Sequence, residues 1–437
     1  MSSSAKTVSY LDILKIPHAP RTFLAALVAR LAYGTVFLAL VLTVSAATGS
    51  YTMAGGVLAL FGLTSSVLAP FRARLVDRYG ARRALLPMAC VCAVLLGSIA
   101  VVAWEPGAPR AMLWILGGAS GATAPPVGPF MRSLWAAVIP SDRELLQRAY
   151  ALDTVTEELI YVVGPLLAGA FTAFADPALG VAFSAALLLI GTAALVASPV
   201  VADLHLGPPT EREDRAVPGD RQSGPRAAPA GPSRRFWPGG GLLEPVVITA
   251  GLGAGLGALS LLTVAFADEH GSVASVSWIQ AALSVSSVLG GLLYGAVSWR
   301  LSNQIRLPLL AVLLSFFCAL AGLAGGMVML AIVIAGAGFL ISPALTTAYL
   351  RAGEVNPEGN STEANTWVGS AFNTGNAAGS AGFGLLLAPF SVAACFVLAG
   401  VVIFLPAALV ALRVCWQKMS SKKELADSPG PASLNSK

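Results

Sequence analysis

The chain has 437 residues, of which 56% are hydrophobic and only 11% are charged, and its mean hydropathy is +0.75. Soluble globular chains carry about 25% charged residues, so this composition excludes an ordinary soluble protein and indicates a polytopic membrane protein. The formal net charge of +5 does not indicate a nucleic-acid partner, because the positive residues gather on one side of the predicted membrane.

Six apolar runs lie before residue 205, each near the length of about 20 residues that a helix needs to cross a bilayer. The predicted spans are residues 22–47, 52–71, 84–104, 109–136, 149–173 and 177–202. The first run is too long for a signal-peptide core, so we expect it to remain as a span behind a cytoplasmic N-terminus, residues 1–21. Pro125, Pro126 and Pro129 should break hydrogen bonds within the fourth span and kink it.

Residues 203–240 form a polar segment rich in Pro, Gly, Arg and acidic residues, which predicts a flexible cytoplasmic linker. Six further runs follow, at residues 242–267, 272–297, 307–325, 327–350, 364–387 and 390–413. Residues 414–437 share the linker's character, and we interpret them as a flexible cytoplasmic tail. The sequence therefore predicts an all-α membrane protein with twelve transmembrane helices in two six-helix bundles, residues 22–202 and 241–413.

Lysine and arginine are distributed very unevenly between the two sides of this predicted topology. The side shared by both termini and the linker carries nearly all of them, whereas the opposite side holds Arg110 alone. Because positively charged loops stay in the cytoplasm, we expect both termini to be cytoplasmic in a multi-pass protein of the cell membrane.

The two halves also share short sequence patterns at matching places. A-x-x-x-D-R at 73–78 corresponds to G-x-x-x-W-R at 295–300, and A-L-D-T at 151–154 corresponds to A-F-N-T at 371–374. These matches indicate that one six-helix unit was duplicated, which makes the two bundles pseudo-symmetric. Transporters built in this way place the substrate near mid-membrane between two halves that rock against each other.

Two motifs resemble those of the major facilitator superfamily. The stretch RARLVDRYGARR at 72–83 resembles the signature of the loop between spans two and three, although alanine replaces its first glycine and the basic pair is displaced by one residue. The matching positions are Ala73, Asp77, Arg78, Gly80, Arg82 and Arg83. In the fifth span, GPLLAG at 164–169 resembles the motif of the superfamily's exporters. The resemblance implies the major facilitator fold and an exporter of the drug/proton antiporter type.

The charged stretch at 72–83 has a predicted role as a gate. Asp77 should accept hydrogen bonds from the backbone at a neighbouring helix N-terminus, after which Gly80 permits a tight turn. Arg78, Arg82 and Arg83 should grip helix ends of the other half, so that the cluster stabilises one cytoplasm-closed arrangement, as the resemblance also implies. For Arg72 and Arg74 we favour a topological role. A kink at Gly164-Pro165 would suit the same alternation between two shapes.

Ionisable residues inside the spans indicate function because they are costly to bury in a membrane. Asp153, Glu157, Tyr161 and Pro165 recur at four-residue intervals along one face of the fifth span, and Glu158 lies beside them. Arg30 should lie at a similar depth, which predicts a salt bridge to Glu157 or Glu158. That bridge either opens to carry protons or bind a cationic substrate, or it is a static pair, with Asp153 close to the headgroups.

The predicted function is secondary active transport by alternating access, most simply proton-coupled efflux of a small amphipathic drug-like or natural-product compound. Trp367, Asn373 and Asn376 could line the cavity with aromatic and amide groups, or could equally pack between helices. No nucleotide-binding loop and no metal-ligand spacing occurs, so we expect no ATP hydrolysis, no cofactor and no enzyme activity. The alternatives are an importer of a small metabolite with the same fold and a non-transporting membrane sensor. We expect a monomer.

Overall fold

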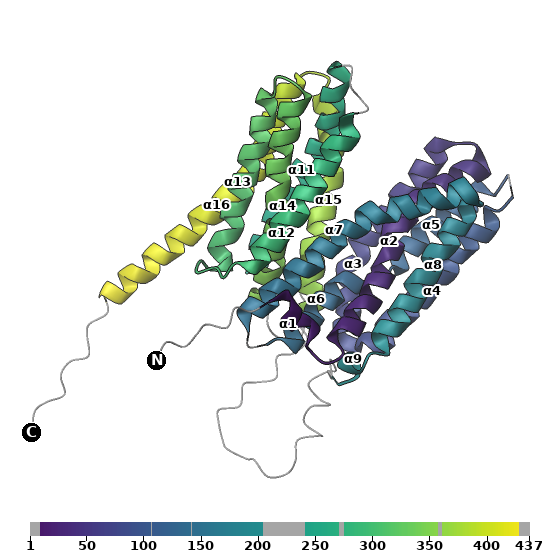
Figure 1. Cartoon of the computed structure of the whole chain (residues 1–437), viewed down its shortest axis with the longest axis horizontal. Helices are drawn as coiled ribbons and strands as arrows, with labels where there is room; N and C mark the ends of the chain where they lie inside the picture. The colour runs from purple at the N-terminus through teal and green to yellow at the C-terminus, as the bar shows by residue number, and fades with distance from the viewer. Residues whose placement is uncertain are drawn as a thin grey trace, which may run out of the picture.

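A computed structural model describes residues 9–105, 107–140, 142–203, 241–270, 275–356 and 361–427. Apart from the short 3-10 segment η2, all the elements assigned in these residues are α-helices (Figure 1). Almost all of the predicted linker lies outside the described residues.

The N-terminal half consists of a bundle of longer helices between two short ones, α1 and α9. Their bounds are α1 Tyr10–Leu14, α2 Ala19–Thr48, α3 Tyr51–Tyr79, α4 Ala81–Val102, α5 Arg110–Thr123, α6 Val127–Val138, α7 Arg143–Phe174, α8 Pro177–Val196 and α9 Pro199–Asp203. Local chemistry sets several of these ends. Gly49 and Gly80, with φ of 65° and 81°, follow α2 and α3, and the Asp142 carboxylate caps α7 by accepting from the Leu145 amide at 2.9 Å.

The C-terminal half contains α11 Leu243–Glu269, α12 Val276–Ala296, α13 Asn303–Leu320, η2 Ala321–Leu323, α14 Met327–Val355, α15 Ser361–Leu386 and α16 Val392–Asp427. The predicted flexible tail from residue 414 is wrong up to residue 427, because α16 continues through it. Residues 417–427 contain neither Gly nor Pro, and eight of the eleven are Gln, Met, Lys, Glu, Leu or Ala, which favour helix over coil.

Among the described residues, ten helices are long and apolar enough to cross a membrane. The predicted fourth span is instead two shorter helices, α5 and α6, separated by residues 124–126. The predicted eleventh span is α15, whose Ser, Thr, Asn and Gly residues lower its hydropathy. The count of twelve transmembrane helices therefore stays a prediction.

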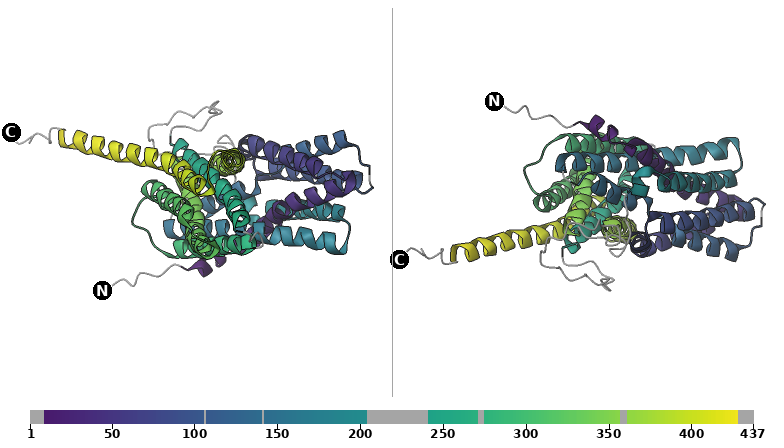
Figure 2. Two further views of the ribbon diagram at one scale, coloured as in Figure 1. Left: turned by 90° about the horizontal axis from the view of Figure 1, so that it is seen from above. Right: turned by 90° about the horizontal axis from the view of Figure 1, so that it is seen from below.

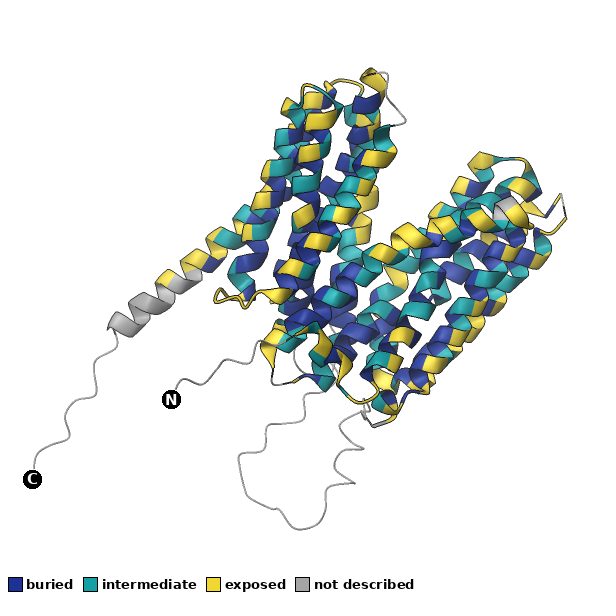
Figure 3. Cartoon of the chain, in the orientation of Figure 1, coloured by how far each residue is buried: buried dark blue, intermediate teal, exposed yellow. Residues whose placement is uncertain are grey.

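The two bundles stand side by side, and α16 extends away from them (Figures 1 and 2). They converge at the end where the α3–α4 turn lies and where the chain leaves α9, which we call the linker end, and they diverge toward the opposite end. Buried residues are dense where the bundles meet (Figure 3). Hydrogen bonds between the halves join α3 to α15, α6 to α15, and α7 to both α12 and α14.

Candidate functional site

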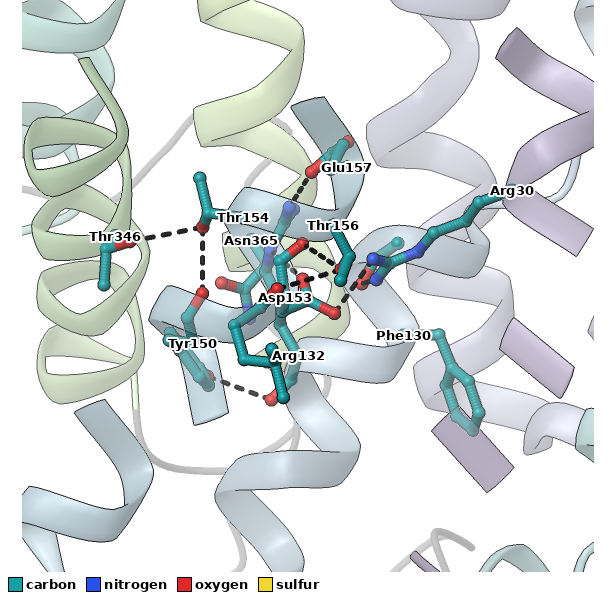
Figure 4. A network of polar contacts seen from close by, with 12 residues as sticks. Arg30, Phe130, Arg132, Tyr150, Asp153, Thr154, Thr156, Glu157, Thr346 and Asn365 are labelled. Carbon is teal, nitrogen blue, oxygen red and sulfur yellow. Dashed lines mark hydrogen bonds and ion pairs between the residues drawn. The ribbon is translucent and has the colours of Figure 1, made fainter. Parts of the chain in front are cut away.

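Four charged side chains of the N-terminal half form a buried ion network (Figure 4). Asp153 on α7 lies between Arg30 of α2 and Arg132 of α6, with one N···O distance of 2.9 Å to each arginine. Arg132 also pairs with Glu157, one turn further along α7. Two guanidinium groups thus balance two carboxylates, which is how buried charges are tolerated.

The predicted partner of Arg30 is wrong. Arg30 pairs with Asp153 rather than with Glu157 or Glu158, and it also donates to the Gly128 carbonyl at 3.0 Å. Asp153, for which a position close to the headgroups was one of the expectations, is fully buried within the protein. Its neighbours explain this, because α2 and α6 both present an arginine to the inner face of α7.

Arg132 was not among the predicted site residues, and it is the centre of the network. It is 1% exposed, and its guanidinium lies over the ring of Tyr349 on α14, 3.7 Å from the centroid, so it also contacts the other half. A signal was present, because Arg132 lies four residues inside the predicted span 109–136. Its basic charge instead suggested a cytoplasmic loop.

Glu158 is separate from this network. Its carboxylate accepts a hydrogen bond of 2.7 Å from the Ser287 hydroxyl on α12, in the C-terminal half. Among the described residues, no ion pair joins Glu158 to an arginine or lysine. Glu157 is 31% exposed, so the network reaches the surface of α7 at that residue.

Close contact between α2 and α7 holds Arg30 and Asp153 in register. A Cβ atom added to Gly164 would lie 2.2 Å from the carbonyl carbon of Gly34, and one added to Gly34 would meet the Ile160 carbonyl oxygen at 2.5 Å. The first glycine of the exporter-like motif is therefore the point where two helices of the same half touch backbone to backbone. Pro165 beside it is exposed, and α7 runs through it without ending.

The charged stretch at 72–83 contacts α15 of the other half. The carboxylate of Asp77 accepts from the amides of Thr362 and Glu363, at 3.3 and 2.9 Å, in the first turn of α15. Arg74 pairs with the Glu363 carboxylate, its Nε donating at 3.0 Å. An acid at the positive end of a helix is favourable, so the α3–α15 contact joins the two halves at the linker end.

The arginines of this stretch differ from their predicted roles. Arg78 lies 5.2 Å from the ring centroid of its neighbour Tyr79, and Arg82 and Arg83 are exposed. In the described part of the chain, no hydrogen bond or ion pair joins these three to the C-terminal half. Arg74 makes the contact predicted for them, because it lies one turn before Asp77 on α3. Arg72, also given a topological role, is 5% exposed and faces α5.

A second contact between the halves lies at the end of α12, next to the G-x-x-x-W-R pattern. Gln147 of α7 donates to the carbonyls of Tyr294 and Val297, each at 3.0 Å, and Arg148 donates to the Ala296 carbonyl at 3.2 Å. The last carbonyls of a helix have no partner within it, so the N-terminal half satisfies the end of α12. We call this the α7–α12 contact.

Helix α1 supports the same place. The hydroxyl of Tyr10 donates to the Leu292 carbonyl of α12 at 2.7 Å. Burial raises the pKa of Tyr10 to about 12, so this hydroxyl keeps its proton at every physiological pH. Tyr10 and Gln147 carry no charge and lie outside any motif, and sequence reasoning missed both.

Of the remaining predicted site residues, Tyr161 lies one turn beyond Glu157 on α7, and the others lie on α15. Tyr161 is 50% exposed, and Asn373 and Asn376 are exposed on α15. The indole nitrogen of Trp367 lies 3.5 Å from the Glu363 carboxylate, within the α3–α15 contact. Among the described residues, no group of three His, Cys, Asp or Glu side chains could hold a metal ion.

One family model and several solved structures are similar to this chain. The family model of the Major Facilitator Superfamily matches residues 22–266. The human organic anion transporter MFSD10 (TETRAN) aligns with a TM-score of 0.61 at 18% identity, covering 90% of this chain and 99% of its own. A bacterial homologue of the iron transporter ferroportin, crystallised in the outward-facing state, gives 0.65 at 14% identity, covering 92% and 99%.

The E. coli fucose:proton symporter FucP also aligns, with a TM-score of 0.61 at 14% identity, covering 92% of this chain and 99% of its own. At such identities, the likeness of these three structures concerns the fold alone. A search of curated proteins finds no match to the chain.

Proposed function

The chain belongs to the major facilitator superfamily, and from this premise we propose that it is a proton-coupled secondary transporter that exports a small amphipathic compound by alternating access. The linker end is the cytoplasmic end in this proposal, because the basic loops gather there and the chain leaves α9 there. The divergence of the bundles toward the other end then corresponds to a conformation that is closed to the cytoplasm.

The observation that supports proton coupling is that some acidic residues of α7 pair with an arginine and one does not. Asp153 and Glu157 are balanced by Arg30 and Arg132, whereas Glu158 receives only the Ser287 hydroxyl in its described surroundings. A carboxylate without a cation in a membrane is costly, and binding a proton removes that cost. Glu158 is therefore the better coupling residue, and the Arg30–Asp153 pair is structural because both residues belong to one half.

Glu158 also lies at the right place for coupling. Its hydrogen bond to Ser287 joins α7 to α12, so it must break whenever the halves separate at this level. Protonation changes the strength of that contact, which links the charge of Glu158 to the equilibrium between the two conformations.

Export rather than import is supported by GPLLAG at 164–169, which resembles the exporter motif. The similar structures include transporters of different substrates, so the substrate does not follow from them.

The test uses everted membrane vesicles that hold a respiration-driven proton gradient, monitored with a pH-sensitive dye. A panel of amphipathic cations and neutral compounds is added, and an antiporter releases protons when it meets its substrate. We expect release with at least one compound, and no release with Glu158→Gln. Glu144→Gln is the matched control, because Glu144 is an exposed acid near the start of α7. Full coupling in Glu158→Gln would refute the role of Glu158, and uptake of compound into right-side-out vesicles would show import instead.

A further inference from the structure

The break between α5 and α6 removes hydrogen bonds from two identifiable carbonyls. In a continuous helix the amides of residues 125 and 126 would donate to the carbonyls of Gly121 and Ala122, four residues earlier. Pro125 and Pro126 have no N–H. Gly121 keeps a 3.3 Å hydrogen bond from the Ala124 amide, whereas no backbone donor in the described chain serves Ala122.

Arg72 of α3 replaces both missing donors. Its Nη1 lies 2.8 Å from the Gly121 carbonyl and 2.8 Å from the Ala122 carbonyl, while its Nη2 donates to the Ser65 carbonyl at 2.6 Å. The side chain is 5% exposed, so water does not take this place. A guanidinium presents several donors in a fixed plane, whereas a lysine ammonium on its flexible stem does not match this pair of acceptors.

The helices approach closely enough for this contact because residue 121 is glycine. A Cβ atom at Gly121 would lie 2.2 Å from the Phe61 carbonyl oxygen of α3. From the other side, the Tyr33 hydroxyl of α2 donates to the Pro125 carbonyl at 2.6 Å. The Pro125 carbonyl also accepts from the Val127 amide at 2.9 Å, while Pro129, four residues later, has no N–H to donate to it. The break is thus braced from two neighbouring helices.

Helix α6 begins directly after the break and carries Arg132 five residues from its start. We propose that Arg72 is a positioning residue: it replaces the hydrogen bonds that Pro125 and Pro126 remove, fixes the angle between α5 and α6, and so places Arg132 between Asp153 and Glu157. This role depends neither on the direction of transport nor on the residue that binds the proton.

The first test is a mutational cycle on the melting temperature of the purified protein. Arg72→Gln should lower Tm by about 5 °C. In a Pro125→Ala/Pro126→Ala background the shift should fall to less than half, because the restored amides serve the same carbonyls. If Arg72→Gln alone cannot be purified, the triple variant Arg72→Gln/Pro125→Ala/Pro126→Ala should still yield folded protein. Failure of the triple variant to fold would overturn the proposal. Equal losses in both backgrounds would overturn the proposal.

The second test measures the angle itself, with spin labels at Ile115 on α5 and Ala137 on α6 in a cysteine-free background. Arg72→Gln should shift or broaden the distance distribution, whereas Arg72→Lys should do so partially. Arg74→Gln is the matched control, because Arg74 lies on the same helix and contacts α15 rather than α5. An unchanged distribution in Arg72→Gln, or an equal change in Arg74→Gln, would show that Arg72 does not set the break.

Discussion

Replacing Asp77 tests whether the α3–α15 contact keeps the linker end closed. Asp77→Ala removes both acceptors of the Thr362 and Glu363 amides, at 3.3 and 2.9 Å. Loss of a helix-capping side chain costs about 0.5–2 kcal/mol, and hydrogen bonds to a charged group are worth about 1.5–3 kcal/mol. A net loss of about 2 kcal/mol would raise the population open at the linker end by about 30-fold.

A cysteine at Ser133 reports this opening. Ser133 is 3% exposed, and its hydroxyl lies 3.0 Å from the Thr362 hydroxyl across the two halves. With the exposed Cys90 and Cys415 replaced by serine, the maleimide labelling rate of Ser133→Cys is proportional to the open population. We expect Asp77→Ala to raise that rate by about 30-fold, with Asp77→Asn intermediate because its amide oxygen keeps one acceptor.

Arg83→Gln is the matched control for this experiment. Arg83 belongs to the same family-like signature, but it is exposed, and the described structure shows no contact from it to the C-terminal half. Its labelling rate should stay within about twofold of the parent's, as expected of surface substitutions. The reasoning would be refuted if Asp77→Ala left the rate unchanged, or if Arg83→Gln raised it equally.

Three further substitutions probe the packing and the second contact. Gly164→Ala should destabilise the fold by about 1–3 kcal/mol, because its Cβ would meet the Gly34 backbone. Gly169→Ala should be tolerated, because a Cβ there would meet no atom within 4 Å. Denaturation of the two purified variants compares their stabilities, and equal losses would contradict this account. Gln147→Ala should raise the labelling rate of Ser133→Cys, and its effect should multiply that of Asp77→Ala because the two sites share no partner. A double variant that is labelled no faster than Asp77→Ala alone would count against two separate contacts. The folded pKa of Tyr10, about 12, lies above its ordinary value of 10.0, so its stabilising effect should be complete below pH 10 and decline toward pH 12. Melting curves of Tyr10→Phe should lack that decline, and an identical pH dependence would argue against the Tyr10 contact.

The helices were predictable because the bilayer imposes their length and hydropathy. The predicted runs correspond to helices of the structure, and several helices run on into polar sequence, as α7 does back to its Asp142 cap and α16 does as far as Asp427. The exception is the fourth span, where the consequence of adjacent prolines was a complete interruption rather than a kink.

The site was predictable only in part, because pairing depends on the rotation of each helix. The sequence predicted that Arg30 lies at the depth of Glu157 and Glu158, but it does not say which carboxylate of α7 faces α2. Arg132 and Arg72 were assigned to topology because a basic residue near a span end satisfies the positive-inside rule equally well whether buried or exposed. Their contacts in the structure show that both are buried: Arg132 pairs with Asp153, and Arg72 donates to the carbonyls that the prolines leave without a donor.

The two contacts at the linker end draw mainly on main-chain atoms of the C-terminal half. Amides of α15 meet the Asp77 carboxylate, and carbonyls of α12 meet the side chains of Gln147, Arg148 and Tyr10. Side-chain replacement in the C-terminal partner leaves those main-chain groups in place. Spontaneous revertants that restore a defective transporter should therefore accumulate mainly in the N-terminal half. C-terminal positions that contribute only main-chain atoms, such as Ala296 and Val297, should be free to drift in sequence, whereas Glu363, whose carboxylate pairs with Arg74, should not.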